Sequence, residues 1–299
     1  MTTEFISYSK PNLWMAAIKP PMYSVAIIPI CVGTAVAFAE TKVFVGWHFA
    51  TFLMSAILIV AWINLSNDVF DCESGIDKNI AHSLVNLTGN KQLIFWLGNL
   101  FLGLGLFGIS AIAFWQKDVT IIGLIMLCCG LGYTYQGPPF RLGYQGLGEI
   151  ICFICFGPLA VAAAYYSQAQ SLSVTTLSAS VVVGVATSLI LFCSHFHQIA
   201  DDLAAGKKSP IVRLGTLKAA NLLPWLGGSI YILTTMLAIL GSFPIWTLLI
   251  WLSCPFAVKL VQHIQQNHDR PDTVSNCKFI AVALHFWSGL LLSLGFMLG

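Results

Sequence analysis

The stretch WINLSNDVFDCESGID, residues 62–77, ends an apolar run and concentrates acidic residues in a chain of which only 9% is charged. The acids are Asp68, Asp71, Glu73 and Asp77. On a helix at 100° per residue, four polar side chains with i, i+3, i+4, i+7 spacing share one face. They are Asn64, Asn67, Asp68 and Asp71. We therefore predict a helix with a polar stripe at its end, stopped near Gly75 and followed by Asp77 in a loop.

The composition around this stretch excludes an ordinary soluble domain, since 57% of the residues are hydrophobic and the mean hydropathy is +0.82. A bilayer-spanning helix needs roughly 20 mostly apolar residues. The chain has nine such stretches, at 20–39, 45–66, 92–114, 119–135, 147–166, 176–199, 221–241, 244–263 and 279–298. We predict an all-α polytopic membrane protein in which residues 1–299 form a single domain, a bundle of nine transmembrane helices.

The charged residues predict the orientation of this bundle. With nine spans, only Lys42 and Lys117 of the 14 Lys and Arg residues fall on one side of the membrane. The positive-inside rule makes the other, basic side cytoplasmic, together with the N-terminus. Most acids, including those of residues 68–77, fall on this side too. We therefore expect an active-site cavity on the cytoplasmic side, and both the plasma membrane and the thylakoid membrane suit this topology.

A second acidic segment, HFHQIADDLAAGKKSPIVRLG at residues 195–215, has the same plan as the first. An apolar helix ends, acids appear, and a glycine and a basic cluster follow. His195, Gln198 and Asp202 share one helical face. Each segment follows an even-numbered helix, four helices apart, which suggests internal duplication of a four-helix unit with acidic motifs in loops 67–78 and 195–213.

Together the two segments provide carboxylates for a hard divalent cation and cations for phosphate. Mg²⁺ takes one or two protein carboxylates and completes its octahedron with water and substrate phosphate. The candidate side chains that donate hydrogen bonds to the phosphate oxygens are Lys78, Lys207, Lys208 and Arg213. This set predicts a diphosphate substrate, because Mg²⁺ must bridge its negative charge to the carboxylates. Either segment alone could instead be a solvated loop at a membrane boundary.

With these motifs the chain resembles the UbiA superfamily of intramembrane aromatic prenyltransferases. The resemblance is carried by nine spans, by Asn67-Asp68-x-x-Asp71 after the second span, and by Asp202 with Gly206-Lys207 after the sixth. It implies two Mg²⁺ ions that bridge the diphosphate, and catalytic roles for Asp68, Asp71 and Asp202. The implied metal ligands are Asn67, Asp68, Asp71, Asp77, Asp201 and Asp202.

Further segments of the sequence, such as NDVFDCESGID and YTYQGPPFRLGYQGLGEI, are similar to those of the branch of the family that prenylates a naphthoate. This resemblance implies phytyl or another long-chain prenyl diphosphate as donor. The implied acceptor is 1,4-dihydroxy-2-naphthoate, which is decarboxylated in phylloquinone or menaquinone biosynthesis. The other expected partner is the lipid bilayer, and no nucleic acid is expected.

The chain departs from the family pattern at both motifs. Gly75 stands where the general pattern has a further Asp, and Asp77 occupies the position that the naphthoate branch uses. His197 and Gln198 replace the usual Arg-Asp pair, so that a D-x-x-x-D motif becomes Gln198-x-x-x-Asp202. Asp201, the neighbouring acid, is the candidate to compensate for the lost charge at the second metal.

The loop that begins YTYQGPPFRLGYQGLGE, residues 133–149, adds aromatic and basic candidates. Aromatic faces stabilise a cation, although Tyr also concentrates at membrane interfaces. Arg141, a further catalytic candidate, and Lys19 could pair with the acceptor carboxylate or the diphosphate, or anchor the headgroup region. The predicted substrate-binding set is Lys19, Asn64, Lys78, Tyr135, Tyr144, His197, Gln198, Lys207, Lys208 and Arg213.

Two alternatives remain open at this point. The first keeps the chemistry and changes the acceptor to homogentisate or 4-hydroxybenzoate. The second is a cation- or proton-coupled transporter, whose acids usually lie near the bilayer midplane on broken helices. The acids of this chain lie at the predicted ends of helices, which favours the enzyme.

Overall fold

The computed structural model describes residues 19–74 and 83–299, and every regular element in this part of the chain is helical. The long segments are α2 (Ser24–Thr41, after the short η1, Pro20–Tyr23), α3 (Gly46–Ser74), α5 (Lys91–Gln116), α6 (Thr120–Gln136), α7–η2–α8 (Gly148–Ile154, Cys155–Leu159 and Ala160–Ala169), α9 (Val174–Ser194), α12 (Thr216–Ile239), η3–α13 (Ile245–Ser253 and Cys254–Asn267) and α15 (Cys277–Leu298). The short helices are α4 (Leu84–Thr88), α10 (Ile199–Ala204), α11 (Pro210–Leu214) and α14 (Pro271–Val274).

These elements confirm an all-α polytopic membrane protein. Among the described residues, eight helical segments are long and apolar enough to cross a membrane, judged by length and composition, and α6 is a shorter apolar helix of 17 residues. The nine predicted segments correspond to these eight and α6. Large apolar side chains such as Phe114 (86% exposed) and Trp225 (75% exposed) stand on the outer surface, which suits a lipid environment.

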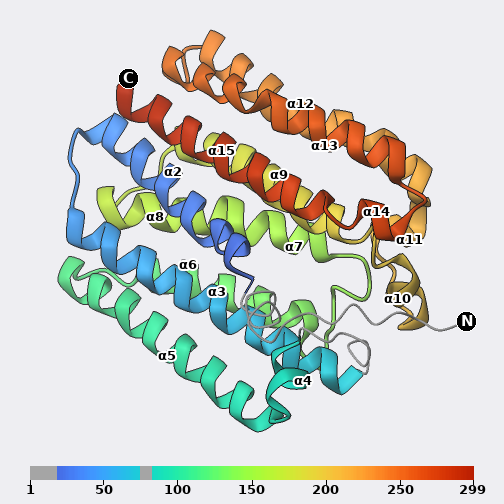
Figure 1. The fold of residues 1–299 in the computed structure, drawn as a ribbon. Coiled ribbons are helices and arrows are strands. Elements are labelled where there is room, and N and C mark those ends of the chain that lie inside the picture. Colours follow the sequence, from blue (N-terminus) through green and yellow to red (C-terminus); the bar gives the residue numbers. More distant parts are fainter. Residues whose placement is uncertain (1–18, 75–82) are drawn as a thin grey trace, which may run out of the picture.

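The helices are arranged in two halves that share α2 and α8 (Figure 1). One core cluster joins α9, α12, α13 and α15, and the other joins α3, α5 and α6; α2 and α8 contribute to both. Figure 1 shows α12 and α13 at one margin of the bundle and α5 at the other. The two shared helices pack closely, because a Cβ on Gly33 would lie 2.4 Å from the carbonyl oxygen of Val161.

Two boundaries differ from the sequence prediction in ways that affect the polar motifs. α3 continues to Ser74, which agrees with the helix stop predicted near Gly75, but it extends beyond the apolar span predicted to end at residue 66, so the motif assigned to loop 67–78 is helical through Ser74. In the second motif, α10 gives residues 199–204 their own short helix. The polar stripe lowers the hydropathy of the end of α3, but the backbone stays helical because its polar face borders a cavity and its other residues are packed, including Leu65 and Val69.

The fifth span contains a local break. Cys155–Leu159 forms a π-helical turn with Pro158 inside it. Proline has no N–H group to donate and its ring clashes with the preceding turn, and a wider turn accommodates both effects. Phe156, within this turn, lines both cavities described below.

Candidate active site

A cavity of about 350 Å³ opens at the end of the bundle where α3 finishes. It is enclosed by the end of α3, the end of α6, the start of α7, the end of α9 with α10, and the first turn of α15. Most of its charged and amide side chains lie on α3, α10 and the adjoining loops, while Gln136 lies on α6 and Lys278 on α15, and apolar side chains such as Val60, Ile63 and Ile190 also line it. The polar residues of α3 and those around α10 form two acidic walls.

The first acidic wall consists of Asn64, Asn67, Asp68 and Asp71 on α3. Asp68 is 4% exposed, and one of its oxygens, Oδ2, accepts a hydrogen bond from the backbone N–H of Leu84 at 2.9 Å. Its other oxygen, Oδ1, lies 3.4 Å from Nζ of Lys19. Both oxygens of Asp71 accept from Nε2 of Gln136, at 2.9 and 3.1 Å. The two carboxylates are therefore held by a cation and by N–H donors, and both line the cavity.

The second acidic wall consists of His195, Gln198, Asp201, Asp202 and Lys207. Asp202 is 1% exposed, and its oxygens lie 2.8 Å from Nδ1 of His195 and 3.4 Å from Nζ of Lys207. Burial alone would raise the pKa of Asp202, but the hydrogen bond with His195 and the charge of Lys207 lower it to below its usual value. The ionised carboxylate is thus the favoured form.

His195 also connects this wall to α7. Its Nε2 lies 3.5 Å from Oε1 of Glu149, opposite the side that contacts Asp202. The imidazole is 2% exposed and stands between two carboxylates. It therefore fixes the orientation of Asp202 toward the cavity, in the way that outer hydrogen bonds orient ligating groups.

The donor set suits a divalent cation with oxygen ligands. Asp68, Asp71 and Asp202 supply carboxylates, and Asn67 adds an amide oxygen to the same cavity. Within residues 19–74 and 83–299, no three His, Cys, Asp or Glu side chains form a closed metal-binding group. The carboxylates stand on separate walls, so a cation here would take one or two of them and complete its shell from water or a ligand, which is the usual mode for Mg²⁺. Asp77, the remaining predicted ligand, lies outside the described residues.

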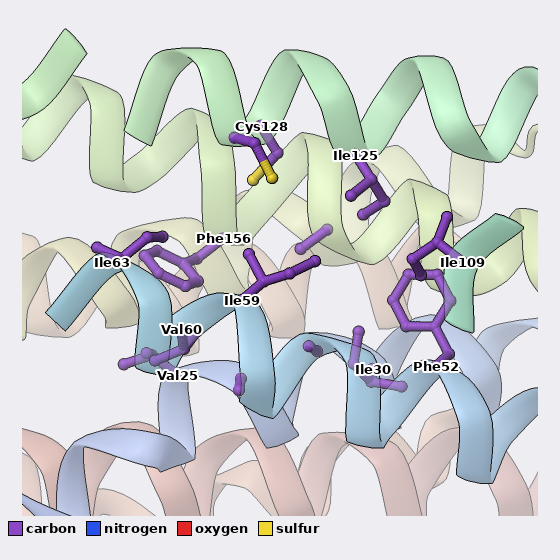
Figure 2. Close-up of a pocket in the computed structure, with 14 residues that line it drawn as sticks. Val25, Ile30, Phe52, Ile59, Val60, Ile63, Ile109, Ile125, Cys128 and Phe156 are labelled. Carbon is purple, nitrogen blue, oxygen red and sulfur yellow. The ribbon is translucent and has the colours of Figure 1, made fainter. Parts of the chain in front are cut away.

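An apolar pocket of about 40 Å³ continues deeper between α2, α3, α5, α6 and the π-helical turn (Figure 2). It shares Val25, Val60, Ile63 and Phe156 with the larger cavity. Figure 2 shows Phe156 and Ile63 on one side of this pocket, and Phe52, Ile30 and Ile109 on the other. The lining is aliphatic, aromatic or thiol, so the pocket is apolar, but its volume leaves room for only a few atoms of a hydrocarbon chain.

Comparison with known proteins places this arrangement in a family. The model of the UbiA prenyltransferase family matches residues 26–290. The chain belongs to the UbiA prenyltransferase family. It is 58% identical over 285 residues to the 2-carboxy-1,4-naphthoquinone phytyltransferase of Synechocystis sp., covering 95% of this chain and 93% of that one. It is 42% identical to the chloroplastic 2-carboxy-1,4-naphthoquinone phytyltransferase of Arabidopsis thaliana, over 97% of this chain and 78% of that one.

The fold of this UbiA-family protein also resembles a solved structure. A UbiA homolog from Archaeoglobus fulgidus bound to GPP and Mg²⁺ superposes with a TM-score of 0.59 over 94% of this chain and 99% of that one. The sequence identity is 16%, so the likeness concerns the fold.

In this UbiA-family protein the cavity brings together most of the predicted site residues. Those that line it are Lys19, Asn64, Asn67, Asp68, Asp71, Tyr135, Gln198, Asp201, Asp202 and Lys207. Five other predicted residues are not among its lining residues: Arg141, Tyr144, His197, Lys208 and Arg213. Lys78, like Asp77, lies outside the described residues.

Three of the residues outside the lining tie the loops around the cavity together. Arg213 donates from Nε to the carbonyl of Lys208 at 3.0 Å and from its guanidinium to the carbonyl of Gln145. The backbone N–H of Lys208 donates to the carbonyl of Tyr144 at 2.8 Å, and the hydroxyl of Tyr144 lies 2.8 Å from Oγ of Ser74. These contacts join the loop after α6 to the loop after α10 and to the end of α3.

The close approach of these two loops explains a glycine. Gly146 has φ of 81°, and a Cβ there would lie 2.2 Å from the carbonyl oxygen of Lys208. A side chain is excluded both by the backbone conformation and by the neighbouring loop. Arg213 and Gly146 therefore shape the rim of the cavity.

Sequence reasoning missed several lining residues. Gln136, His195, Ser83 and Lys278 all border the cavity. His195 was predicted to share a helical face with Gln198 and Asp202, but α9 ends at Ser194 and α10 begins at Ile199, so its contact with Asp202 depends on the turn between these two helices. Gln136 lies in the stretch YTYQGPPFRLGYQGLGE, and a single amide side chain among aromatic residues gives no signal of a binding site. Lys278 follows an unremarkable exposed stretch, and nothing in its local sequence marks it.

Proposed function

We propose that this protein transfers a phytyl or another long prenyl chain from its diphosphate to 1,4-dihydroxy-2-naphthoate, with loss of the acceptor carboxylate, in phylloquinone or menaquinone biosynthesis. The observation that carries the proposal is one cavity lined by two acidic walls, from α3 and from the region of α10, together with apolar side chains. The names of the Synechocystis and Arabidopsis relatives, both naphthoquinone phytyltransferases, support the acceptor and the donor.

The two walls suit the diphosphate. Mg²⁺, which accompanies GPP in the Archaeoglobus homolog, would when bound neutralise the diphosphate and stabilise the charge of the leaving group. Asp68, Asp71 and Asn67 on one wall, and Asp201 and Asp202 on the other, are the residues that would hold two such ions. Lys207 stands beside Asp202 and can donate to a phosphate oxygen as charge develops there.

The apolar part of the cavity suits the chain and the reactive carbon. The part of the prenyl chain nearest the diphosphate would lie against the apolar lining of the larger cavity, which includes Phe156 and Ile63, so that the allylic end remains between the walls. The allylic C–O bond breaks with its electron pair leaving on the diphosphate. The electron-rich ring carbon that carries the carboxylate then forms the new C–C bond, and loss of that carboxylate as CO₂ leaves its bonding electrons in the ring and restores aromaticity. A cavity within a helix bundle keeps water from the allylic cation.

The orientation of the protein forms part of this proposal. Lys19, Asp68 and Asp202 lie at one end of the bundle, and Glu40 and Asp118 lie at the other, bonded to Tyr165 and Tyr166. The positive-inside rule places the end with the cavity on the cytoplasmic side. Both water-soluble head groups would then reach the site from the cytoplasm, and the tail from the bilayer.

The test is product formation by the detergent-solubilised protein with phytyl diphosphate and 1,4-dihydroxy-2-naphthoate, in Mg²⁺ or in EDTA, followed by mass spectrometry. We expect a prenylated naphthoquinol lacking the carboxylate, formed only with Mg²⁺ and detected as the naphthoquinone after oxidation by dioxygen in air. Asp68→Ala should abolish turnover in a monodisperse sample. Turnover with homogentisate or 4-hydroxybenzoate alone would overturn the acceptor. Failure with every acceptor would overturn the enzyme and return the transporter to consideration.

A further inference from the structure

One of the three lysines that line the cavity has no acidic partner in the described part of the chain. Lys278 lines the cavity from the second position of α15. Lys19 pairs with Asp68 and Lys207 pairs with Asp202, but none of the ion pairs among residues 19–74 and 83–299 includes Lys278. Its Nζ lies 5.3 Å from the centroid of the adjacent Phe279 ring. The positive charge of Lys19 repels the ammonium group of Lys278.

This placement has no evident structural benefit. A cation in the first turn of a helix opposes the helix dipole, which favours anions at that end. Partial burial removes water from the ammonium group, and the neighbouring Lys19 adds like-charge repulsion. Each effect favours a bound anion at this point. The ammonium groups of Lys19 and Lys278 line the same cavity, and Lys278 stands in the first turn of α15, a helix of 22 residues.

The surroundings of Lys278 select the kind of anion. On the elements that pack against α15, the cavity lining includes apolar Met22, Val25 and Ile190, with Thr187 and Ser194 of α9 as its polar members. α15 packs against α2, α9 and η1. The diphosphate already has the carboxylate walls and Lys207. A flat apolar body that carries a single negative charge, such as an aromatic carboxylate, fits an apolar flank that ends in an ammonium group.

We propose that Lys278, with Lys19 beside it, binds the carboxylate of the aromatic acceptor and so determines the preference for a carboxylated ring. This inference rests on the proposed function, since it assigns the second substrate of the same cavity. Lys278 acts in recognition: it holds the acceptor so that its ring faces the allylic end of the donor.

The experiment compares Lys278→Met and Lys278→Gln, which remove the charge, with Lys278→Arg, which keeps it. Lys218→Met is the matched control, because Lys218 also lies in the first turn of a long helix but is exposed and does not line the cavity. Steady-state KM is measured for 1,4-dihydroxy-2-naphthoate, for 1,4-dihydroxynaphthalene and for phytyl diphosphate. The shift in melting temperature caused by the naphthoate alone, without Mg²⁺ or donor, reports binding directly.

We expect both neutral variants to raise KM for the carboxylated acceptor about tenfold or more, the loss of one charge-assisted hydrogen bond. KM for the donor and for the ring without a carboxylate should stay unchanged, and Lys278→Arg should retain most of the affinity. The naphthoate-dependent melting shift should be lost in the neutral variants and kept in Lys218→Met.

Two results would overturn the inference. One is unchanged KM for the naphthoate in whichever neutral variant is folded. The other is a raised KM for phytyl diphosphate with both acceptors, which would assign Lys278 to the diphosphate. Failure of the proposed function itself is seen separately, as absence of product in the unmodified protein before any variant is made.

Discussion

Asp71 provides a sharp test of the first acidic wall, because its structural and chemical roles have different magnitudes. In Asp71→Asn the side chain keeps its size, and the remaining carbonyl oxygen can still accept from Nε2 of Gln136. A hydrogen bond to a charged group contributes about 1.5–3 kcal/mol and a neutral one about 0.5–1.5 kcal/mol, so we expect a stability loss of about 1 kcal/mol. The apparent melting temperature should fall by a few degrees at most.

The expected effect of the same change on catalysis is larger. Loss of one preorganised group that stabilises developing charge typically costs about 2.7–4 kcal/mol, or roughly 10²–10³ in rate. We therefore predict that Asp71→Asn lowers kcat by at least about 10² while the protein remains monodisperse. The assay is initial-rate formation of prenylated naphthoquinone, with size-exclusion chromatography and thermal unfolding measured on the same sample. Asp272→Asn, an exposed acid on α14 away from the cavity, is the control.

A compensating variant tests position as distinct from charge. Asp71→Asn combined with Gln136→Glu reverses the donor and the acceptor of this contact and returns a carboxylate to the cavity on α6. We expect the pair to recover stability but not turnover, because the charge no longer projects from α3. Near-normal turnover in the single variant would refute a chemical role for Asp71. Recovery of turnover in the double variant would refute the requirement for a carboxylate on α3.

Two further predictions concern the scaffold of the site. Gly33→Ala should destabilise the protein, because overpacking of α2 on α8 costs about 1–3 kcal/mol and the better helix propensity of alanine offsets at most about 1 kcal/mol of this. Gly103→Ala, with open space around its Cβ, should be neutral or stabilising in the same thermal unfolding assay. Equal effects of the two changes would contradict the packing argument. Arg213→Lys should raise KM for phytyl diphosphate about tenfold, because the lost contacts with Gln145 hold the loop that carries Lys207; an unchanged KM would show that the loop is held by other contacts.

The sequence alone determined the class of fold, because hydropathy and helical spacing are local properties. Roughly twenty apolar residues at a time predict a span wherever they occur, and each of the nine predicted segments corresponds to a helical segment of the structure. The stripe of Asn64, Asn67, Asp68 and Asp71 followed from the 3.6-residue repeat for the same reason. The end of α3 followed from the helix stop at Gly75, whereas the apolar span ended earlier, at residue 66, because hydropathy falls where a helix turns its polar face to a cavity although the backbone continues unchanged.

Tertiary structure alone decided which polar residues share the cavity. Arg213 and Lys208 belong to a basic cluster that suggests phosphate binding, yet their contacts tie two loops together at the rim. Gln136 and Lys278 carry no comparable local signal, yet both border the cavity. They come from helices far apart in the chain, and their proximity depends on how α2, α6, α9 and α15 pack. Periodicity identifies the face of a helix, but only packing determines what that face meets.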